Sequence, residues 1–198
     1  MRKVSIVFML LAFAVSVSAQ EQNPAKDDMR NASFFGPVVR FTSIRKQAGV
    51  MAGLRGSWPV GRSLALGGAA YFLISKVNAP EDALPLEGPL DVDLTYLGFE
   101  LEYFLNPGSQ TRFSLSALFG GGASRYVKDT GSFFRSNEQS GETAFMFIVE
   151  PGGNVEWTVA KWLRLMAGVS YRLVSGTRQE KLTDRDLRGP SATIAFKF

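Results

Sequence analysis

The sequence predicts an eight-stranded antiparallel up-and-down transmembrane β-barrel, an all-β fold that follows a cleaved signal peptide. Three observations carry this prediction. Apolar and polar residues alternate with a period of two over long segments, the connections between those segments alternate in length, and aromatic residues gather near the segment ends. Strands with lipid on one side and a filled lumen on the other are expected to show this pattern.

Residues 1–19, MRKVSIVFMLLAFAVSVSA, have the pattern of a secretory signal peptide: a basic start, an apolar run and small residues at the end. The alternative is a membrane anchor, but the apolar run is about a dozen residues, short of the ~20 that span a bilayer. We expect cleavage after Ala19. Residues 20–31 are polar and predict a flexible periplasmic lead-in. Residues 32–198 are then the outer-membrane β-barrel domain.

The first four predicted strands place apolar residues at one parity and small, polar or charged residues at the other. The fourth is the clearest, with Leu97, Phe99 and Leu101 on one face and Glu100 and Glu102 on the other. The four segments are 34–44 (FFGPVVRFTSI), 49–58 (GVMAGLRGSW), 63–75 (SLALGGAAYFLIS) and 93–105 (DLTYLGFELEYFL).

The last four predicted strands follow the same rule. Pro151-Gly152-Gly153 interrupts the sixth strand, but the parity is the same on both sides, so we interpret the interruption as a local distortion and not a turn. The four segments are 111–126 (TRFSLSALFGGGASRY), 143–158 (TAFMFIVEPGGNVEWT), 162–174 (WLRLMAGVSYRLV) and 191–198 (SATIAFKF).

The connections also fit a transmembrane barrel, which has short periplasmic turns and longer extracellular loops. The first connection, at 45–48, is the exception. An even number of strands places both termini in the periplasm. The other short connections are 59–62, 106–110 and 159–161, and the long polar ones are 76–91, 127–142 and 175–188.

A soluble eight-stranded barrel of the lipocalin kind is the alternative fold, with its apolar face inside. Aromatic placement favours the membrane, because interface belts need aromatic rings at both ends of the strands. Trp58, Trp157 and Trp162 lie beside short connections, as the periplasmic belt requires. For the opposite belt we expect the set Tyr71, Tyr126, Phe145 and Tyr171.

The charged parity is expected to face a narrow lumen, where buried charges must be paired. We therefore predict a salt-bridged plug. The inward set is Arg40, Arg55, Arg112, Arg164, Arg172, Lys197, Glu100, Glu102, Glu150 and Glu156, joined by Tyr71 and Met146.

The last strand carries apolar residues at every second position up to Phe198, and this end resembles the C-terminal signal of bacterial outer-membrane barrels, which the barrel-assembly machinery reads. The whole mature chain resembles the small eight-stranded barrels typified by OmpA and OmpX. FFGPVVRFT, KWLRLMAGVSYRLVSG and GPSATIAFKF resemble segments of uncharacterised outer-membrane β-barrel proteins. The resemblance implies the cell outer membrane of a Gram-negative bacterium, with lipid and lipopolysaccharide around the barrel. It does not imply one activity, since this fold hosts adhesins, enzymes, resistance factors and structural proteins.

The composition excludes several chemistries. The chain has no His and no Cys, which excludes histidine-dependent catalysis, a thiolate nucleophile and the usual zinc sites. The formal charge of +4 falls to +2 once Arg2 and Lys3 leave with the signal peptide, too little for a nucleic-acid binder. Enzymes known on similar barrels resemble one another in relying on a His at the rim. We predict no catalytic, cofactor-binding or metal site and no cofactor.

Three weaker patterns have structural interpretations. Glu100 and Glu102 would lie ~7 Å apart, a separation possible for a catalytic pair, but lumen ion pairs explain them better. The glycine pairs do not open an amphipathic helix, as a phosphate-binding loop would require. Loop acids Asp129, Asp184 and Asp186 could bind a divalent ion, but solvation is the expected state.

The favoured function is a non-enzymatic, monomeric outer-membrane barrel, structural or interacting through its extracellular loops. The alternatives are a narrow pore or transport-associated barrel, and a His-free lipid-active enzyme at the outer rim. Basic loop residues are expected to meet lipopolysaccharide phosphates: Lys76, Lys128, Arg135, Arg178, Lys181, Arg185 and Arg188.

Overall fold

The computed structural model describes most of the predicted barrel domain. The described residues are 33–60, 62–80, 90–107, 109–128, 139–160, 162–177 and 181–198. The predicted signal peptide and lead-in lie outside the described residues and stay predictions.

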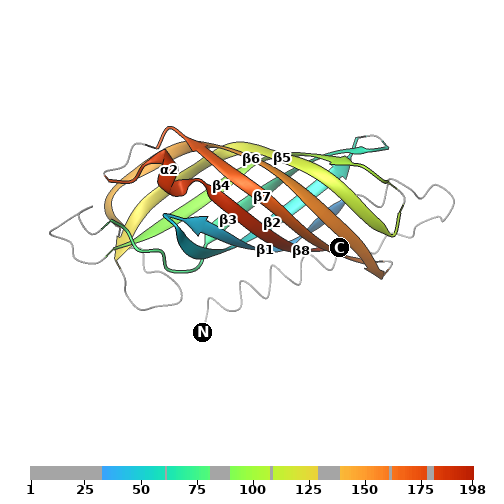
Figure 1. Ribbon diagram of the computed structural model, residues 1–198, viewed down its shortest axis with the longest axis horizontal. Coiled ribbons are helices and arrows are strands. Elements are labelled where there is room, and N and C mark those ends of the chain that lie inside the picture. The colour runs from blue at the N-terminus through green and yellow to red at the C-terminus, as the bar shows by residue number, and fades with distance from the viewer. Residues whose placement is uncertain are drawn as a thin grey trace.

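Eight antiparallel strands close into a barrel in chain order, with β8 pairing back onto β1 (Figure 1). This confirms the predicted fold class. Within the described ranges, no helix is long and apolar enough to cross a membrane. The elements are β1 (Phe34–Ile44), β2 (Gln47–Pro59), β3 (Leu64–Leu73), β4 (Leu90–Phe104), β5 (Thr111–Lys128), β6 (Gln139–Ala160), β7 (Leu163–Ser175), α2 (Asp184–Leu187) and β8 (Gly189–Lys197).

Six strands extend further toward the loop end than predicted, whereas β1 ends at Ile44 as predicted and β3 ends at Leu73, before the predicted residue 75. β1 and β2 are joined by a two-residue turn at Arg45 and Lys46, both with positive φ, where the sequence predicted a connection at 45–48. The turn lacks the Asn-Gly pair that usually marks such a hairpin. β4 begins at Leu90, before the predicted residue 93. The sequence pattern missed these first residues because the outward ones are polar, so apolar residues no longer mark the outer face of the strand.

The interruption in the sixth strand behaves as predicted. β6 pairs with β7 through Val149↔Leu173 on one side of Pro151 and through Gly152↔Ser170 on the other, which is one unchanged register. The parity of β6 is therefore the same before and after the proline.

An apolar belt surrounds the barrel. Leu97, Phe99 and Leu101 point outward, Phe99 with 83% of its surface exposed. On β7 the belt runs from Leu163 to Leu173, a distance that corresponds to ~25 Å of membrane thickness at the usual strand rise and tilt. Exposed side chains of this size and continuity need lipid around them.

The aromatic belt at the short-turn end is confirmed, because Trp58, Trp157 and Trp162 are all exposed there. The predicted opposite belt is wrong for Tyr71 and Tyr126, which are buried in the lumen with about 1–2% exposure. Both tyrosines share the parity of inward residues, and that parity, not their place near a strand end, decides where they point. Phe145 and Tyr171 are exposed, as predicted.

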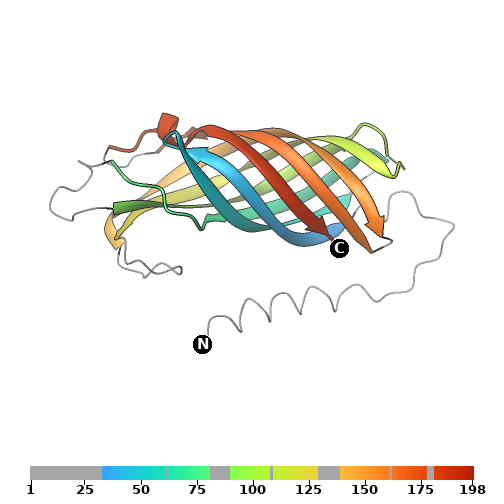
Figure 2. The same cartoon turned by 60° about the horizontal axis from the view of Figure 1, so that its bottom comes forward.

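The two ends of the barrel differ. The C-terminus lies at the short-turn end, and α2 lies at the opposite end with the long loops (Figure 1, Figure 2). Phe198 stacks against Trp162, with ring centroids 6.3 Å apart.

Candidate functional site

The lumen near the short-turn end holds a network of buried ion pairs. Arg55 Nε lies 2.6 Å from Glu100 Oε2, and Arg55 Nη2 lies 3.5 Å from Glu102 Oε2. Arg112 Nη2 lies 2.6 Å from Glu156 Oε2. Lys197 Nζ contacts Glu156 and lies 3.7 Å from Glu102 Oε2. The strand parity places these groups on the inner face, and their mutual attraction offsets the cost of taking them out of water.

Polar and aromatic neighbours complete this network. Ser114 donates a hydrogen bond to Glu102 Oε1 at 2.6 Å, and the Asn154 amide donates to the same oxygen at 3.2 Å. Asn154 was not singled out from the sequence, although its even parity on β6 places it inside. Lys197 Nζ lies 3.8 Å from the ring centroid of Phe34, and the Arg112 guanidinium lies 4.9 Å from that of Phe104. These two buried rings form an aromatic floor.

A second layer of the lumen is built on Arg40. Its Nη1 lies 2.6 Å from Glu150 Oε1 and donates to the Tyr96 hydroxyl at 2.5 Å. Its Nη2 donates to the Tyr71 hydroxyl at 2.9 Å, and its guanidinium lies over the Tyr71 ring, 3.8 Å from the centroid. Tyr71, which was expected at the outer interface, therefore holds an internal arginine instead.

Arg172 departs from the predicted plug. Its side chain is fully buried, but among the described residues it donates to main-chain oxygens, to Leu187 at 2.8 Å and Ser43 at 3.1 Å. It joins β7 to the loop that carries α2, while Arg164 of the same strand is only half-buried. The other predicted inward charges, Arg40, Arg55, Arg112, Lys197 and the four glutamates, are in the ion pairs described above.

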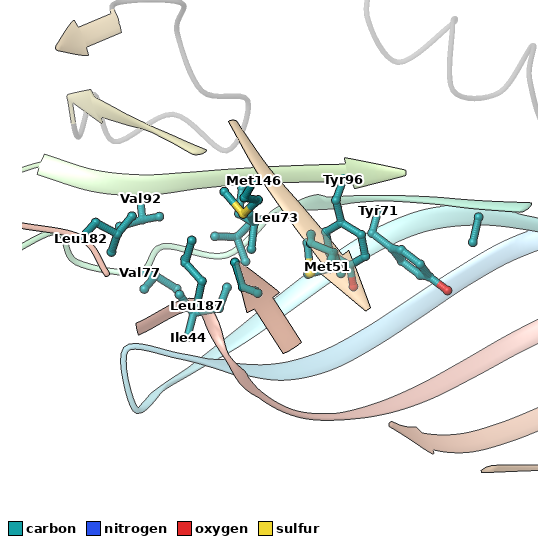
Figure 3. Close-up of a cluster of buried hydrophobic side chains, with 14 of the residues drawn as sticks. Ile44, Met51, Tyr71, Leu73, Val77, Val92, Tyr96, Met146, Leu182 and Leu187 are labelled. Carbon is teal, nitrogen blue, oxygen red and sulfur yellow. The ribbon is translucent and has the colours of Figure 1, made fainter. Parts of the chain in front are cut away.

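The loop end of the lumen is apolar instead of charged, which the sequence did not predict. Leu182 and Leu187 from the α2 loop and Val77 from the β3–β4 connection point into it (Figure 3). They pack against a cluster from the strands, and together these side chains form an apolar roof. The strand members labelled in Figure 3 at this end are Ile44, Met51, Leu73, Val92 and Met146.

Two predicted loop acids have structural roles. Asp184 accepts hydrogen bonds from the main-chain N–H groups of Gly176 and Thr177, and Asp186 accepts from the Thr183 N–H and hydroxyl. Burial alone would raise the pKa of the Asp184 carboxyl, but the hydrogen bonds from Thr177 and Gly176 hold it below its ordinary value. Asp129 lies outside the described residues.

The basic loop residues do not form one group. Arg188 donates twice to the Val174 carbonyl oxygen, while Lys76, Lys181 and Arg185 are exposed. Arg135 and Arg178 lie outside the described residues. Within the described part of the chain, no group of three or more His, Cys, Asp or Glu residues could hold a metal ion.

Comparison with known proteins gives matches only among solved structures: no protein-family model matches the chain, and no curated protein matches it. The chain is similar to the crystal structure of Neisserial surface protein A (NspA), with a TM-score of 0.55 and 16% identity over 84% of this chain and 96% of that one.

Two further solved structures match with TM-scores below 0.5. The N-terminal β-barrel domain of Pseudomonas aeruginosa OprF has 11% identity and a TM-score of 0.46, covering 83% of this chain and 97% of that one. Ail, the attachment invasion locus protein of Yersinia pestis, has 9% identity and a TM-score of 0.47, covering 83% and 95%.

An apolar outer belt around an ion-paired lumen defines a membrane-type β-barrel. The similarity to NspA adds that the chain has the fold of the small eight-stranded outer-membrane barrels, the group that includes OmpA and OmpX.

Proposed function

We propose that the protein is a non-enzymatic barrel of the bacterial outer membrane, with both termini in the periplasm and with its loops exposed outside the cell. The observation that carries the proposal is the combination of a continuous apolar belt with a lumen filled by buried ion pairs. A barrel built in this way needs lipid or detergent to cover its apolar belt.

The loop end is the proposed interaction surface. α2 and the β1–β2 turn meet there, joined by the Arg45 N–H, which donates to the Asp186 carbonyl oxygen at 2.6 Å. Exposed Lys46 and Arg185 are available to lipopolysaccharide phosphates at this end. Phe198 and Trp162, stacked at the other end, support a role for the last strand in recognition by the barrel-assembly machinery.

The alternatives receive less support. A pore needs an open path, but Phe34 and Phe104 fill the lumen at one end and Leu182 and Leu187 fill it at the other. An eight-stranded barrel has an interior that side chains can fill. For an enzyme, the lumen carboxylates are held by arginines and lysine, and Glu100 and Glu102 are both engaged with Arg55.

Orientation and location can be tested together, because the chain has no cysteine of its own. Lys46→Cys introduces a thiol at the loop end, and Arg62→Cys introduces one at the short-turn end. On intact cells, we expect a membrane-impermeant maleimide to label Lys46→Cys at once and Arg62→Cys only after the outer membrane is permeabilised. The opposite order, or recovery of the protein in the soluble fraction, would overturn the proposal.

The interaction itself needs a separate measurement. Lipopolysaccharide added to the purified barrel in a neutral detergent should raise its unfolding temperature, whereas lipid without phosphate groups should not. Lys46→Gln with Arg185→Gln should reduce that shift without changing the unfolding temperature in detergent alone. An unchanged shift would show that these residues do not bind the phosphates.

A further inference from the structure

The wall of the barrel has one interrupted ladder away from the strand ends. Between β6 and β7, backbone pairing stops after Val149↔Leu173 and resumes at Gly152↔Ser170 in the same register. Glu150 and Pro151 therefore have no backbone-paired residue on β7. On its other side, at the same level, β6 stays paired with β5 through Leu118↔Glu150 and Ala117↔Pro151. The other two interruptions in the described ladders accompany register shifts close to strand ends.

Pro151 explains the interruption. The register places it opposite Tyr171 of β7. In an antiparallel sheet the N–H and C=O of one residue point to the same neighbouring strand, and every second residue points to the same side. The Val169 carbonyl oxygen lies against Gly152, so Tyr171, two residues on, also faces β6. Proline has no N–H, so Pro151 cannot donate to the Tyr171 carbonyl oxygen. Tyr171 lies on the lipid face, where water is not at hand to replace the lost bond.

A polar cavity lies directly behind this part of the wall. It has room for about one water molecule and is lined by Arg40, Arg55, Glu150, Asn154 and Ser170, among others. Arg55 is almost completely buried. Its Nη2 lies 3.5 Å from Glu102 Oε2 and makes no hydrogen bond among the described residues. The guanidinium beside the cavity therefore keeps a donor that is engaged only by this longer ion pair.

The wall beside the cavity is thin. Gly168 of β7 lines the cavity, and a Cβ at this position would overlap the Asn154 Oδ1 atom. Gly152 and Gly153 of β6 follow Pro151 directly. Val169 of β7 both lines the cavity and has 67% of its surface exposed on the outer face, so one strand separates the cavity from the surrounding lipid.

One side-chain hydrogen bond links β6 and β7 beside the interruption in their ladder. Glu150 Oε1 accepts a hydrogen bond from Ser170 Oγ on β7 at 2.5 Å, and the same carboxylate is held by Arg40 and by the Tyr96 hydroxyl at 2.9 Å. A competing hydroxyl group could replace Ser170 as the donor to Glu150 and accept from Arg55. Removing a charged headgroup from water would cost far more free energy than removing an uncharged hydroxyl, which favours the hydroxyl as the bound group.

We propose that the wall opens laterally between β6 and β7 at Pro151 and Tyr171, and admits the hydroxyl end of a bilayer-dissolved amphiphile to the cavity beside Arg55 and Glu150. The proposal rests on the membrane embedding proposed above and adds a binding site to it. The site is reached from the lipid, since the aromatic floor and the apolar roof close the lumen at its two ends.

The absence of native cysteine allows a direct test in phospholipid vesicles that contain the full barrel. Ser170→Cys places a thiol beside the cavity, and Ser191→Cys is the matched control. Ser191 is the cross-strand partner of Ser170, is buried, and lies behind uninterrupted ladders on both sides of β8. An alkyl maleimide dissolved in the bilayer should modify Ser170→Cys about 10-fold faster than Ser191→Cys. The labelling rate follows the fraction of open wall, and the loss of one hydrogen bond changes that fraction by about this factor.

Two further measurements examine the wall and the ligand. Pro151→Val restores an N–H, and in the Ser170→Cys background it should slow labelling at least ~10-fold. Dodecanol in the vesicles should protect the thiol of Ser170→Cys, whereas dodecane should not. Equal labelling at the two positions, no effect of Pro151→Val, faster labelling by a water-soluble maleimide, or equal protection by both compounds would each overturn the proposal.

Failure of this proposal is distinguishable from failure of the proposed function. If the protein does not embed in membranes, it will not enter vesicles as a folded barrel with heat-modifiable mobility. If only the portal is wrong, the barrel will enter the vesicles and the Ser170→Cys thiol will stay unmodified. Should Ser170→Cys not fold, amide hydrogen exchange of the natural chain decides: the Tyr171 N–H, which faces Pro151 in the interrupted ladder, should exchange faster than the Ser191 N–H, which lies in the uninterrupted β7–β8 ladder.

Discussion

Glu156 provides the sharpest test of the ion-paired lumen, because it contacts two buried cations at once. Arg112 Nη2 lies 2.6 Å from one of its oxygens, and Lys197 Nζ contacts the other. Glu156→Gln keeps the size of the side chain and removes its charge. Removing one partner from a buried ion pair costs about 3–5 kcal/mol, and we expect the free energy of unfolding to fall by that amount. At 1.4 kcal/mol per factor of ten, the unfolding equilibrium should change more than a hundredfold.

The assay is urea unfolding of the purified barrel in phospholipid vesicles, followed by the fluorescence of its tryptophans. Asp93→Asn is the matched control, since it removes a carboxylate from the partly exposed pair with Arg125 on the outer face. Such pairs contribute about 0–1 kcal/mol, so the control should change stability little. Lys197→Met added to Glu156→Gln should restore part of the lost stability, because it removes one of the uncompensated charges. Equal losses in Glu156→Gln and Asp93→Asn would refute the reasoning.

Three other outcomes follow from the structure. Leu101→Arg, in the middle of the belt on β4, should lower the free energy of unfolding by about 2–4 kcal/mol, and Leu105→Arg at the strand end by about 0–1 kcal/mol; equal losses would contradict the assigned belt. The depressed pKa of Asp184 means that the loop contact is present above the ordinary value of 3.8 and is lost as pH falls through the lower folded value. The Thr177 amide NMR signal should report this loss, and the titration should be absent in Asp184→Asn. Planar-bilayer recordings of the natural chain should show no steady conductance, whereas ohmic, ion-selective currents would favour a pore.

Strand parity was enough to predict the orientation of most charged residues, because a period of two assigns every side chain to one face. It could not predict the pairing partners. Arg40 meets Glu150 across the lumen, and that contact depends on the register and tilt of β1 and β6, which the sequence pattern does not contain. Parity also placed Arg172 among the paired charges, but it donates to the main-chain oxygens of Leu187 in α2 and Ser43 in β1.

Tyr71 and Tyr126 show a second limit of the sequence. Aromatic rings near strand ends suit an interface belt, but a lumen that contains arginines also accepts them, because the ring face and the hydroxyl both bind a guanidinium. For Tyr71, parity and position gave opposite predictions, and parity was correct. The apolar roof was missed because its loop members, such as Leu187, lie outside any alternating segment.

The polarity of the barrel inverts along its length, and β4 shows where. Toward the short turns, its outward residues are apolar and its inward residues are Glu100 and Glu102. Toward the loops the inward residues become apolar, with Val92 and Leu94 fully buried, while the outward side carries Asp93 paired with Arg125. The parity is constant, so the change must come from the surroundings: lipid outside the first part and water outside the second. The loop part is therefore held by hydrophobic burial, as in the soluble eight-stranded barrel that was the alternative fold, whereas the rest depends on the bilayer.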